Sequence, residues 1–177
     1  MKSKRASFFQ ALIARFLVDH LEECEVEEES RLKDLFVYDP LHNPLRRRAP
    51  APRPDFVIRR DTDVIAVLDA KYRDLWENSL PRDMLYQLAL YALGQQEGRR
   101  RSAILYPVLD RAAREQAILI RDPLLARQQA QVILRPINLI DLDEMIRGGS
   151  AARRQRMELT RRLAFGEEVA PQFRPHV

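Results

Sequence analysis

The residues that could do chemistry are two aspartates and a lysine in the stretch from Pro54 to Lys71, PDFVIRRDTDVIAVLDAK. Two short apolar runs in this stretch flank a polar turn, a pattern that predicts a β-hairpin. Asp69 and Lys71 then project from the same face of the second strand, because side chains alternate along a strand. Antiparallel pairing would place Asp55, at the start of the first strand, beside Asp69. The hairpin therefore predicts two carboxylates and one ammonium group at one end of a sheet.

This combination of side chains suits a site for a divalent metal. Mg²⁺ or Mn²⁺ takes oxygen ligands and keeps several waters, so one or two carboxylates are enough to hold it. We predict Asp55 and Asp69 as metal ligands, with the backbone carbonyl of Ala70 as a third. A metal in this place would lower the pKa of a bound water and stabilise charge that builds up on a phosphodiester. Lys71 would orient the attacking water and help to neutralise the transition state.

A plain ion pair at the end of a strand is the alternative. The chain has 26 acidic residues, so an acid two positions before one of its few lysines arises by chance about half of the time. A surface pair of Asp69 and Lys71 would contribute little. However, the pair ends an otherwise aliphatic run, where buried charge is costly. A lysine is also an unusual choice in so arginine-rich a chain, and both features favour the catalytic hypothesis.

A helix predicted from Arg82 to Gln96 follows the hairpin. Gln87 and Tyr91 are four residues apart and therefore share one face of this helix. Gln87 could hold Lys71 or a water by hydrogen bonding, and Tyr91 could support that group or meet a phosphate. An ordinary polar helix face is the alternative for both residues.

The rest of the chain predicts helices and strands around the hairpin. Leu32 to Tyr38 fits either a strand or a short helix, and Asp39 to Arg53, with four prolines, is predicted as a loop. The other expected elements are a first helix from Ser7 to about Glu23 with Phe8 on its apolar face, a hairpin of strands Ser102–Val108 and Glu115–Arg121, a strand at Ala130–Arg135, and helices at Asn138–Ile146 and Ala151–Leu163.

This order of elements predicts one α/β domain over residues 1–177, with a mixed β-sheet flanked by helices. Its core is expected at about residues 7–147, followed by a C-terminal helix and tail at 151–177. No apolar run is long enough to span a membrane. The single Cys24 rules out an internal disulfide, and the basic N-terminal segment is interrupted by Gln10 and Arg15. We therefore expect a cytoplasmic protein.

Charge is distributed unevenly along the chain. The formal net charge is +4, yet six glutamates fall between Glu22 and Glu29, so the remainder is markedly basic. Arginines in the proline-rich loop are candidate contacts for the phosphates of DNA. A solvated, arginine-rich surface explains them equally well. The candidate nucleic-acid-binding residues are Arg46, Arg47, Arg48 and Arg53.

The pattern Pro54-Asp55 … Asp69-Ala70-Lys71 resembles the PD-(D/E)xK nuclease superfamily. The strings RPDFVI, VIAVLDAKY and DMLYQLALYAL are similar to the C-terminal nuclease domain of the McrC family, the cleavage subunits of the McrBC modification-dependent restriction system. VILRPINL also resembles the closing strand of that family. The resemblance covers about residues 8–146 and is strongest over 53–93.

That resemblance implies a restriction-endonuclease-like core and Mg²⁺-dependent cleavage of DNA. It implies Asp55 and Asp69 as metal ligands and Lys71 as the catalytic lysine. Gln87 and Tyr91 match the family's glutamine-x-x-x-tyrosine on the helix behind the site, and so count among the catalytic residues. A motor subunit of the AAA+ GTPase type, as in McrB, is an implied partner, and cutting both strands of a duplex would need a homodimer or another second site.

Two features depart from the family. The first helix of the family contributes a glutamate to the metal site, and Gln10 stands at the matching place, where an amide could hold the metal only through a water. We also expect these 177 residues to lack the N-terminal region with which the family engages its motor partner. A catalytically weak or inactive module that binds DNA or assembles with a partner is therefore the alternative function. A nuclease that acts on RNA is a third.

Overall fold

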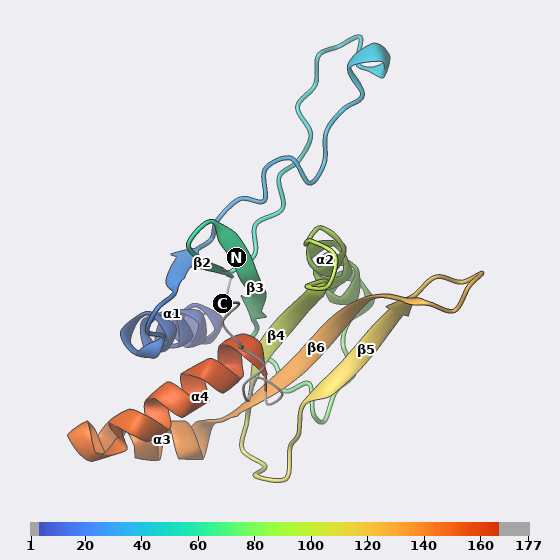
Figure 1. The fold of residues 1–177 in the computed structure, drawn as a ribbon. Coiled ribbons are helices and arrows are strands. Elements are labelled where there is room, and N and C mark those ends of the chain that lie inside the picture. The colour runs from blue at the N-terminus through green and yellow to red at the C-terminus, as the bar shows by residue number, and fades with distance from the viewer. Residues whose placement is uncertain (1–3, 167–177) are drawn as a thin grey trace, which may run out of the picture.

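The computed structural model describes residues 4–166 and places six strands in one mixed sheet with helices on both faces (Figure 1). Strands β3, β4 and β6 are parallel, and the other neighbouring pairs are antiparallel. The α/β class and the mixed sheet are thus as predicted. In spatial order the strands are β1 (Glu25–Glu28), β2 (Phe56–Arg60), β3 (Asp63–Ala70), β4 (Arg101–Val108), β6 (Gln128–Asn138) and β5 (Gln116–Arg121).

Four α-helices cover the two faces of this sheet. One face packs against α1 (Lys4–His20) and α4 (Arg153–Phe165), and the other packs against α2 (Arg82–Leu93) (Figure 1). The remaining helices are α3 (Leu139–Arg147) and the short 3₁₀ turns η1 (Pro40–His42) and η2 (Gly149–Ala152). None of the helices within residues 4–166 is long and apolar enough to cross a membrane.

The predicted hairpin is present as β2 and β3, with Phe56 opposite Leu68 and Val57 opposite Val67. Alternation along the strands sorts the side chains between the two faces. Phe56 and Leu68 pack with α1 and α4, whereas Val67 packs with α2. Asp69, two residues after Val67, therefore projects toward the α2 side of the sheet.

The prediction of a hairpin between β4 and β5 is wrong. Strand β6 lies between them, parallel to β4 and antiparallel to β5. The physical reason is burial: Val132, Ile133 and Leu134 of β6 are all buried, as in a central strand covered on both faces. Strand β5 is mostly exposed, which suits the edge of the sheet.

The start of the chain differs from the sequence prediction in two ways. Helix α1 already includes Lys4, so Ser7 lies within the helix and does not cap it. On its apolar face Phe9 is buried beside Ile13, Phe16 and Leu17, whereas Phe8 is exposed. The acidic block also contains β1, an edge strand in which Glu27 pairs with Arg59 at 2.8 Å. Glutamate is depleted in strands, so the sequence pattern did not predict this strand.

Residues 31–53 form a long arm that projects away from the sheet (Figure 1). The segment 32–38 is neither strand nor helix, and the predicted loop at 39–53 contains only the short η1. At the root of the arm the Leu32 N–H donates to the carbonyl of Pro52, at 2.9 Å. The Arg53 guanidinium donates to the carbonyl of Glu29, at 2.8 Å, and pairs with its carboxylate.

The later helices are close to their predicted positions. The side chain of Asn138 accepts from the N–H groups of Ile140 and Asp141, at 3.0 and 3.1 Å, and so caps α3. Helix α4 contributes Leu159, Leu163 and other apolar residues to the same core as α1 and the hairpin. The core thus extends beyond residue 147, whereas the tail expected after Gly166 lies outside the described residues.

Replacement of Leu163 tests this role of α4. Leu163 is fully buried, so Leu163→Ala should lower the free energy of unfolding by about 2–5 kcal/mol. Leu124→Ala is the control, because Leu124 is 90% exposed in a loop, and it should change stability by less than about 0.5 kcal/mol. Chemical denaturation of both variants measures the difference. Equal stability would show that α4 is not part of the cooperative core.

Candidate functional site

Asp55, Asp69 and Lys71 meet at the end of the hairpin, as the sequence predicted. The Lys71 Nζ lies 2.5 Å from Oδ2 of Asp69 and 3.4 Å from Oδ2 of Asp55. Both aspartates are buried, and Asp69 is only 1% exposed. The Lys71 side chain retains 28% exposure, so the group reaches solvent through its lysine.

The backbone fixes this arrangement. The N–H of Ala70 donates to Oδ2 of Asp55, at 2.9 Å, and the N–H of Lys71 donates to the Leu105 carbonyl on β4, at 3.0 Å. Main-chain groups of successive residues point to opposite sides of a strand, so the Ala70 carbonyl points toward β2. There the register places Ala70 opposite Pro54, which has no N–H to donate. The Ala70 carbonyl is therefore directed to the side where Asp55 lies, as a third metal ligand would have to be.

Burial and mutual repulsion dominate the electrostatics of the two aspartates. Burial, and then the charge of Asp55, raise the pKa of Asp69 from 3.8 to about 6, although Lys71 opposes this. Burial works to lower the pKa of Lys71, but the two carboxylates outweigh it and the pKa lies above its usual value. Lys71 is thus charged at neutral pH. Its single positive charge does not offset the burial and the repulsion by Asp55 that disfavour ionised Asp69.

The oxygens of Asp69 are incompletely satisfied. Within the described residues, the buried Oδ1 has no hydrogen-bond partner, and Oδ2 is in contact with the Lys71 ammonium. A buried acceptor without a donor is costly. The part of the chain described holds no cluster of three or more His, Cys, Asp or Glu side chains suited to a metal. Two carboxylates, a main-chain carbonyl and waters nevertheless form an oxygen donor set that fits Mg²⁺ or Mn²⁺.

Tyr91 and Gln87 lie on α2, which covers the same face of the sheet. Burial raises the pKa of the Tyr91 hydroxyl, and the charges of Asp69, Lys71 and Asp55 also act on it. The structure thus places Tyr91 within electrostatic reach of the group. The Gln87 Nε2 donates to the Tyr91 hydroxyl, at 2.6 Å. Gln87 accordingly orients Tyr91, and the contacts of Lys71 are with the two aspartates.

Gln10 lies half-buried on α1, the helix that packs on the opposite face of the sheet from α2. Its neighbour Phe9 makes an edge-on ring contact with Tyr72, with centroids 5.9 Å apart. The N-terminal part of α1, which carries Gln10, is therefore near the end of β3.

The candidate nucleic-acid contacts lie on the arm. Arg46, Arg47 and Arg48 are exposed, and their side chains form no ion pair within residues 4–166. The turn that presents them is held by Asn43, which exchanges two hydrogen bonds of 2.8 Å with the backbone of Arg47. Arg53 differs because its guanidinium is engaged by Glu29 at the root of the arm.

Tyr106 is a neighbour of the site that the sequence analysis missed. Continuing the register of β3 and β4 places it beside Lys71 and on the same face. Burial, and then the charge of Asp74, raise its pKa to about 12, and its hydroxyl has no hydrogen-bond partner among the described residues. Its place in the apolar run of β4 marked it only as a core residue.

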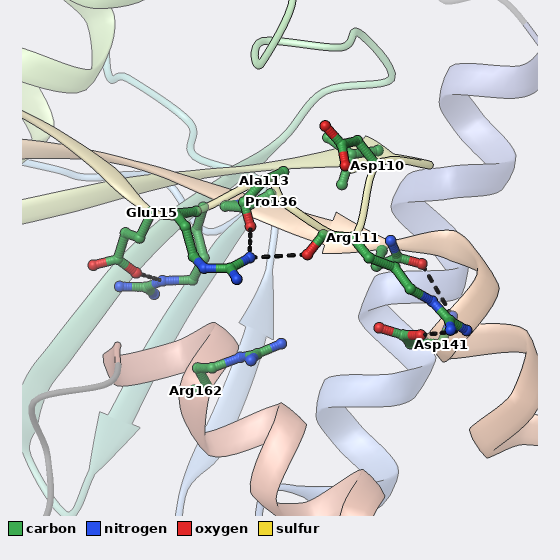
Figure 2. Close-up of a pocket in the computed structure, with 11 residues that line it drawn as sticks. Asp110, Arg111, Ala113, Glu115, Pro136, Asp141 and Arg162 are labelled. Carbon is green, nitrogen blue, oxygen red and sulfur yellow. Dashed lines mark hydrogen bonds and ion pairs between the residues drawn. The ribbon is translucent and has the colours of Figure 1, made fainter.

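Two cavities lie away from this group. One is enclosed by the ends of β4 and β6, the loop after β4, and α4 (Figure 2). The other lies at the opposite end of the sheet, between the first residues of β3 and β4 and the end of α4. Neither cavity is lined by Asp55, Asp69 or Lys71.

Comparison with known proteins finds a distant structural similarity. No protein-family model and no curated protein matches the sequence. Among solved structures, the chain is similar to a chain from a half-complex of the tetradecameric assembly of Thermococcus gammatolerans McrB AAA+ hexamers with bound McrC. The identity is 21% and the TM-score 0.49, over 86% of this chain and 32% of that one. This chain thus spans about a third of the length of the chain it resembles.

The raised pKa of Asp69 predicts how an isosteric amide will change stability. Asp69 binds its proton more tightly in the folded than in the unfolded chain, so its ionisation at neutral pH costs folding free energy. Asp69→Asn should raise the free energy of unfolding at neutral pH by up to about 3 kcal/mol. The gain should shrink as the pH falls from about 6 toward 4, where wild-type Asp69 is protonated.

Denaturation at a series of pH values measures this effect. Asp143→Asn is a suitable control, because Asp143 is an exposed residue of α3 with a surface ion pair to Arg147. It should leave the pH dependence unchanged. A loss of stability in Asp69→Asn at every pH would contradict the assignment of a strained carboxylate.

Proposed function

We propose that this chain is a Mg²⁺-dependent endonuclease that hydrolyses phosphodiester bonds in DNA. The observation that carries the proposal is the convergence of Asp55, Asp69 and Lys71 at the end of β3, with Oδ1 of Asp69 buried and unsatisfied. Two buried carboxylates that share one ammonium group are costly to keep unless they bind a further cation. The resemblance to PD-(D/E)xK nucleases is carried by these same residues. It implies that the cation is Mg²⁺ and that the reaction is cleavage of DNA.

Asp55, Asp69 and the Ala70 carbonyl would hold the metal. Bound there, Mg²⁺ would supply Lewis acidity that activates water and stabilises charge on the phosphate. The chain's own contributions are positional: the Ala70 N–H fixes the Asp55 carboxylate, and both carboxylates keep the Lys71 ammonium charged. That ammonium is partly exposed, so it can donate to a phosphate oxygen or to the attacking water. Tyr91, held by Gln87, supports this face of the site.

The wider role follows from the resemblance to McrC. We infer that the chain is a component of a restriction or defence system, that an AAA+ motor of the McrB type is its partner, and that it works in the cytoplasm. Support comes from the strings around Asp55, Asp69 and Gln87 that resemble the McrC nuclease domain. A homodimer would supply the second site that a double-strand break requires.

Cleavage of supercoiled plasmid tests the catalytic assignment. With Mg²⁺ the wild type should nick or linearise the plasmid, and chelation should stop it. Asp69→Ala and Lys71→Ala should each lower the rate at least about 100-fold, because each removes charge that acts in the transition state. The exposed residues Asp143 and Lys4 offer matched controls, and their alanine variants should keep full activity. Equal cleavage by all four variants would contradict the assignment of Asp69 and Lys71 as catalytic residues.

The arm makes a separate prediction about affinity. Removal of Arg46, Arg47 and Arg48 should weaken DNA binding and reduce the slope of log K against log salt by up to about 2.7, at about 0.9 for each phosphate contact. The matched control removes three exposed helix arginines that already have carboxylate partners, namely Arg15, Arg147 and Arg154. Fluorescence anisotropy over a salt series measures both slopes. A larger effect from the control set would show that the arm does not belong to the DNA-binding surface.

A DNA-binding or assembly module without turnover is the second candidate. Two observations favour it: the described residues offer two carboxylates but no third acidic ligand, and Gln10 replaces the expected glutamate. Salt-dependent DNA binding without cleavage in Mg²⁺ or Mn²⁺ would establish this candidate. Restoration of cleavage by Gln10→Glu would then assign the lost activity to that position.

A further inference from the structure

Two leucines at the far end of the arm lie outside the hydrophobic core. Leu41, within η1, is 88% exposed, and Leu45 is 69% exposed. Figure 1 shows η1 at the end of the arm, away from the sheet, and we call residues 39–47 the tip. Single exposed leucines are ordinary on protein surfaces. These two differ because they share one short turn at the end of a projecting arm, where apolar side chains can enter a partner.

Local hydrogen bonds hold the tip in shape. The Asp39 carboxylate accepts from the N–H of Leu41, at 2.9 Å, and pairs with the His42 ring, at 2.6 Å. Asn43 holds Arg47 through the two backbone bonds already described. Because all of these bonds join residues of the tip, its shape is set locally. A preformed turn loses little conformational entropy on binding, so its leucines can be buried against a partner at low cost.

The arm that carries this tip is strongly basic. Residues 31–53 contain six arginines and lysines and two aspartates. Glu29 offsets Arg53 at the root, which leaves five basic residues against the two acids, and Asp39 is engaged within the tip. The arginines at 46–48 directly follow Leu45, and they form no ion pair within residues 4–166. The other glutamates of the acidic block lie in or before β1, at the opposite end of the arm. The apolar tip is therefore joined to a net positive charge, which favours an anionic partner.

The root of the arm favours DNA over an acidic protein as that partner. Arg53 ends the arm two residues before Asp55. On the other side of the root, the N–H of Glu29 donates to the carbonyl of Asp55, at 2.9 Å. The arm is thus tied on both sides to a candidate metal ligand. A polymer bound along the arm would also reach the carboxylates at which a phosphodiester is proposed to be cut.

We propose that the tip is a minor-groove wedge. Leu41 and Leu45 insert between base steps of duplex DNA, and the arginines at 46–48 bind the groove and its phosphates, so that the duplex bends. Proteins that bend DNA from the minor groove combine these two kinds of side chain. DNA as the ligand rests on the proposed function, whereas the wedge is a separate property of the tip.

The length of the arm limits where the bend can lie. About nine residues along the chain separate Leu32, at the root, from Leu41, and they span at most about 30 Å. This is roughly nine base pairs of duplex, at about 3.4 Å each. The bend therefore lies within about one turn of the double helix from the cleaved bond.

Binding and bending in the presence of a chelator test the wedge without cleavage. The probe is a duplex of about 25 base pairs with a donor dye at one end and an acceptor dye at the other. Wild-type protein should raise energy transfer, because bending shortens the distance between the ends. Leu41→Ala combined with Leu45→Ala should abolish this rise and weaken binding at least about tenfold, since apolar burial is lost. The salt dependence of binding should stay the same, because no phosphate contact is removed.

Leu109→Ala combined with Leu124→Ala is the matched control, because both leucines are exposed in the loops after β4 and β5. It should change affinity less than about twofold and leave bending intact. Wild-type binding and bending by the variant of Leu41 and Leu45 overturns the wedge and leaves a protein as the partner of the tip. Absence of duplex binding by the wild type overturns it as well. Plasmid cleavage in Mg²⁺ is measured separately: cleavage without bending contradicts the wedge alone, and bending without cleavage contradicts the nuclease assignment alone.

Discussion

The burial of two aspartates against one lysine is the constraint on which the site depends. Ionised Asp69 is 1% exposed and shares Lys71 with Asp55, and its pKa rises to about 6 because burial and the second carboxylate disfavour its charge. A fold designed only for stability would replace such a pair with apolar residues. The hairpin keeps it, and the Ala70 N–H holds Asp55 in place against the repulsion. A divalent cation is the simplest partner that would satisfy both carboxylates.

The sheet separates this site from the cavity shown in Figure 2. Because β3, β4 and β6 are parallel, their carboxyl ends share one edge, but Asp69 projects toward α2 whereas the cavity is lined by Arg162 of α4 on the other face. The arm leaves the domain just before Asp55 and is clamped there by Arg53 and Glu29. The arm projects away from the sheet (Figure 1), and it carries the exposed Arg46, Arg47 and Arg48, which form no ion pair with another described residue.

Local patterns predicted the part of the fold that makes the site. Turn residues between two apolar runs were enough for the hairpin, and strand alternation placed Asp69 and Lys71 on one face. Non-local features were beyond these patterns: the insertion of β6 between β4 and β5 depends on which strand is covered on both faces. Glu25 to Glu28 form a strand only because β2 offers an edge to pair with. The cavity joins the β4–β5 loop to α4, residues far apart in sequence.

A crystal structure with Mn²⁺ tests the central claim most directly, because the anomalous signal of manganese locates the ion independently of activity. The account predicts a peak within coordination distance of Asp55, Asp69 and the Ala70 carbonyl, and its loss in Asp69→Asn. Well-ordered aspartates with no metal between them, at a manganese concentration that saturates the protein, would contradict it. The buried carboxylates would then be a structural ion pair with Lys71 and not a catalytic centre.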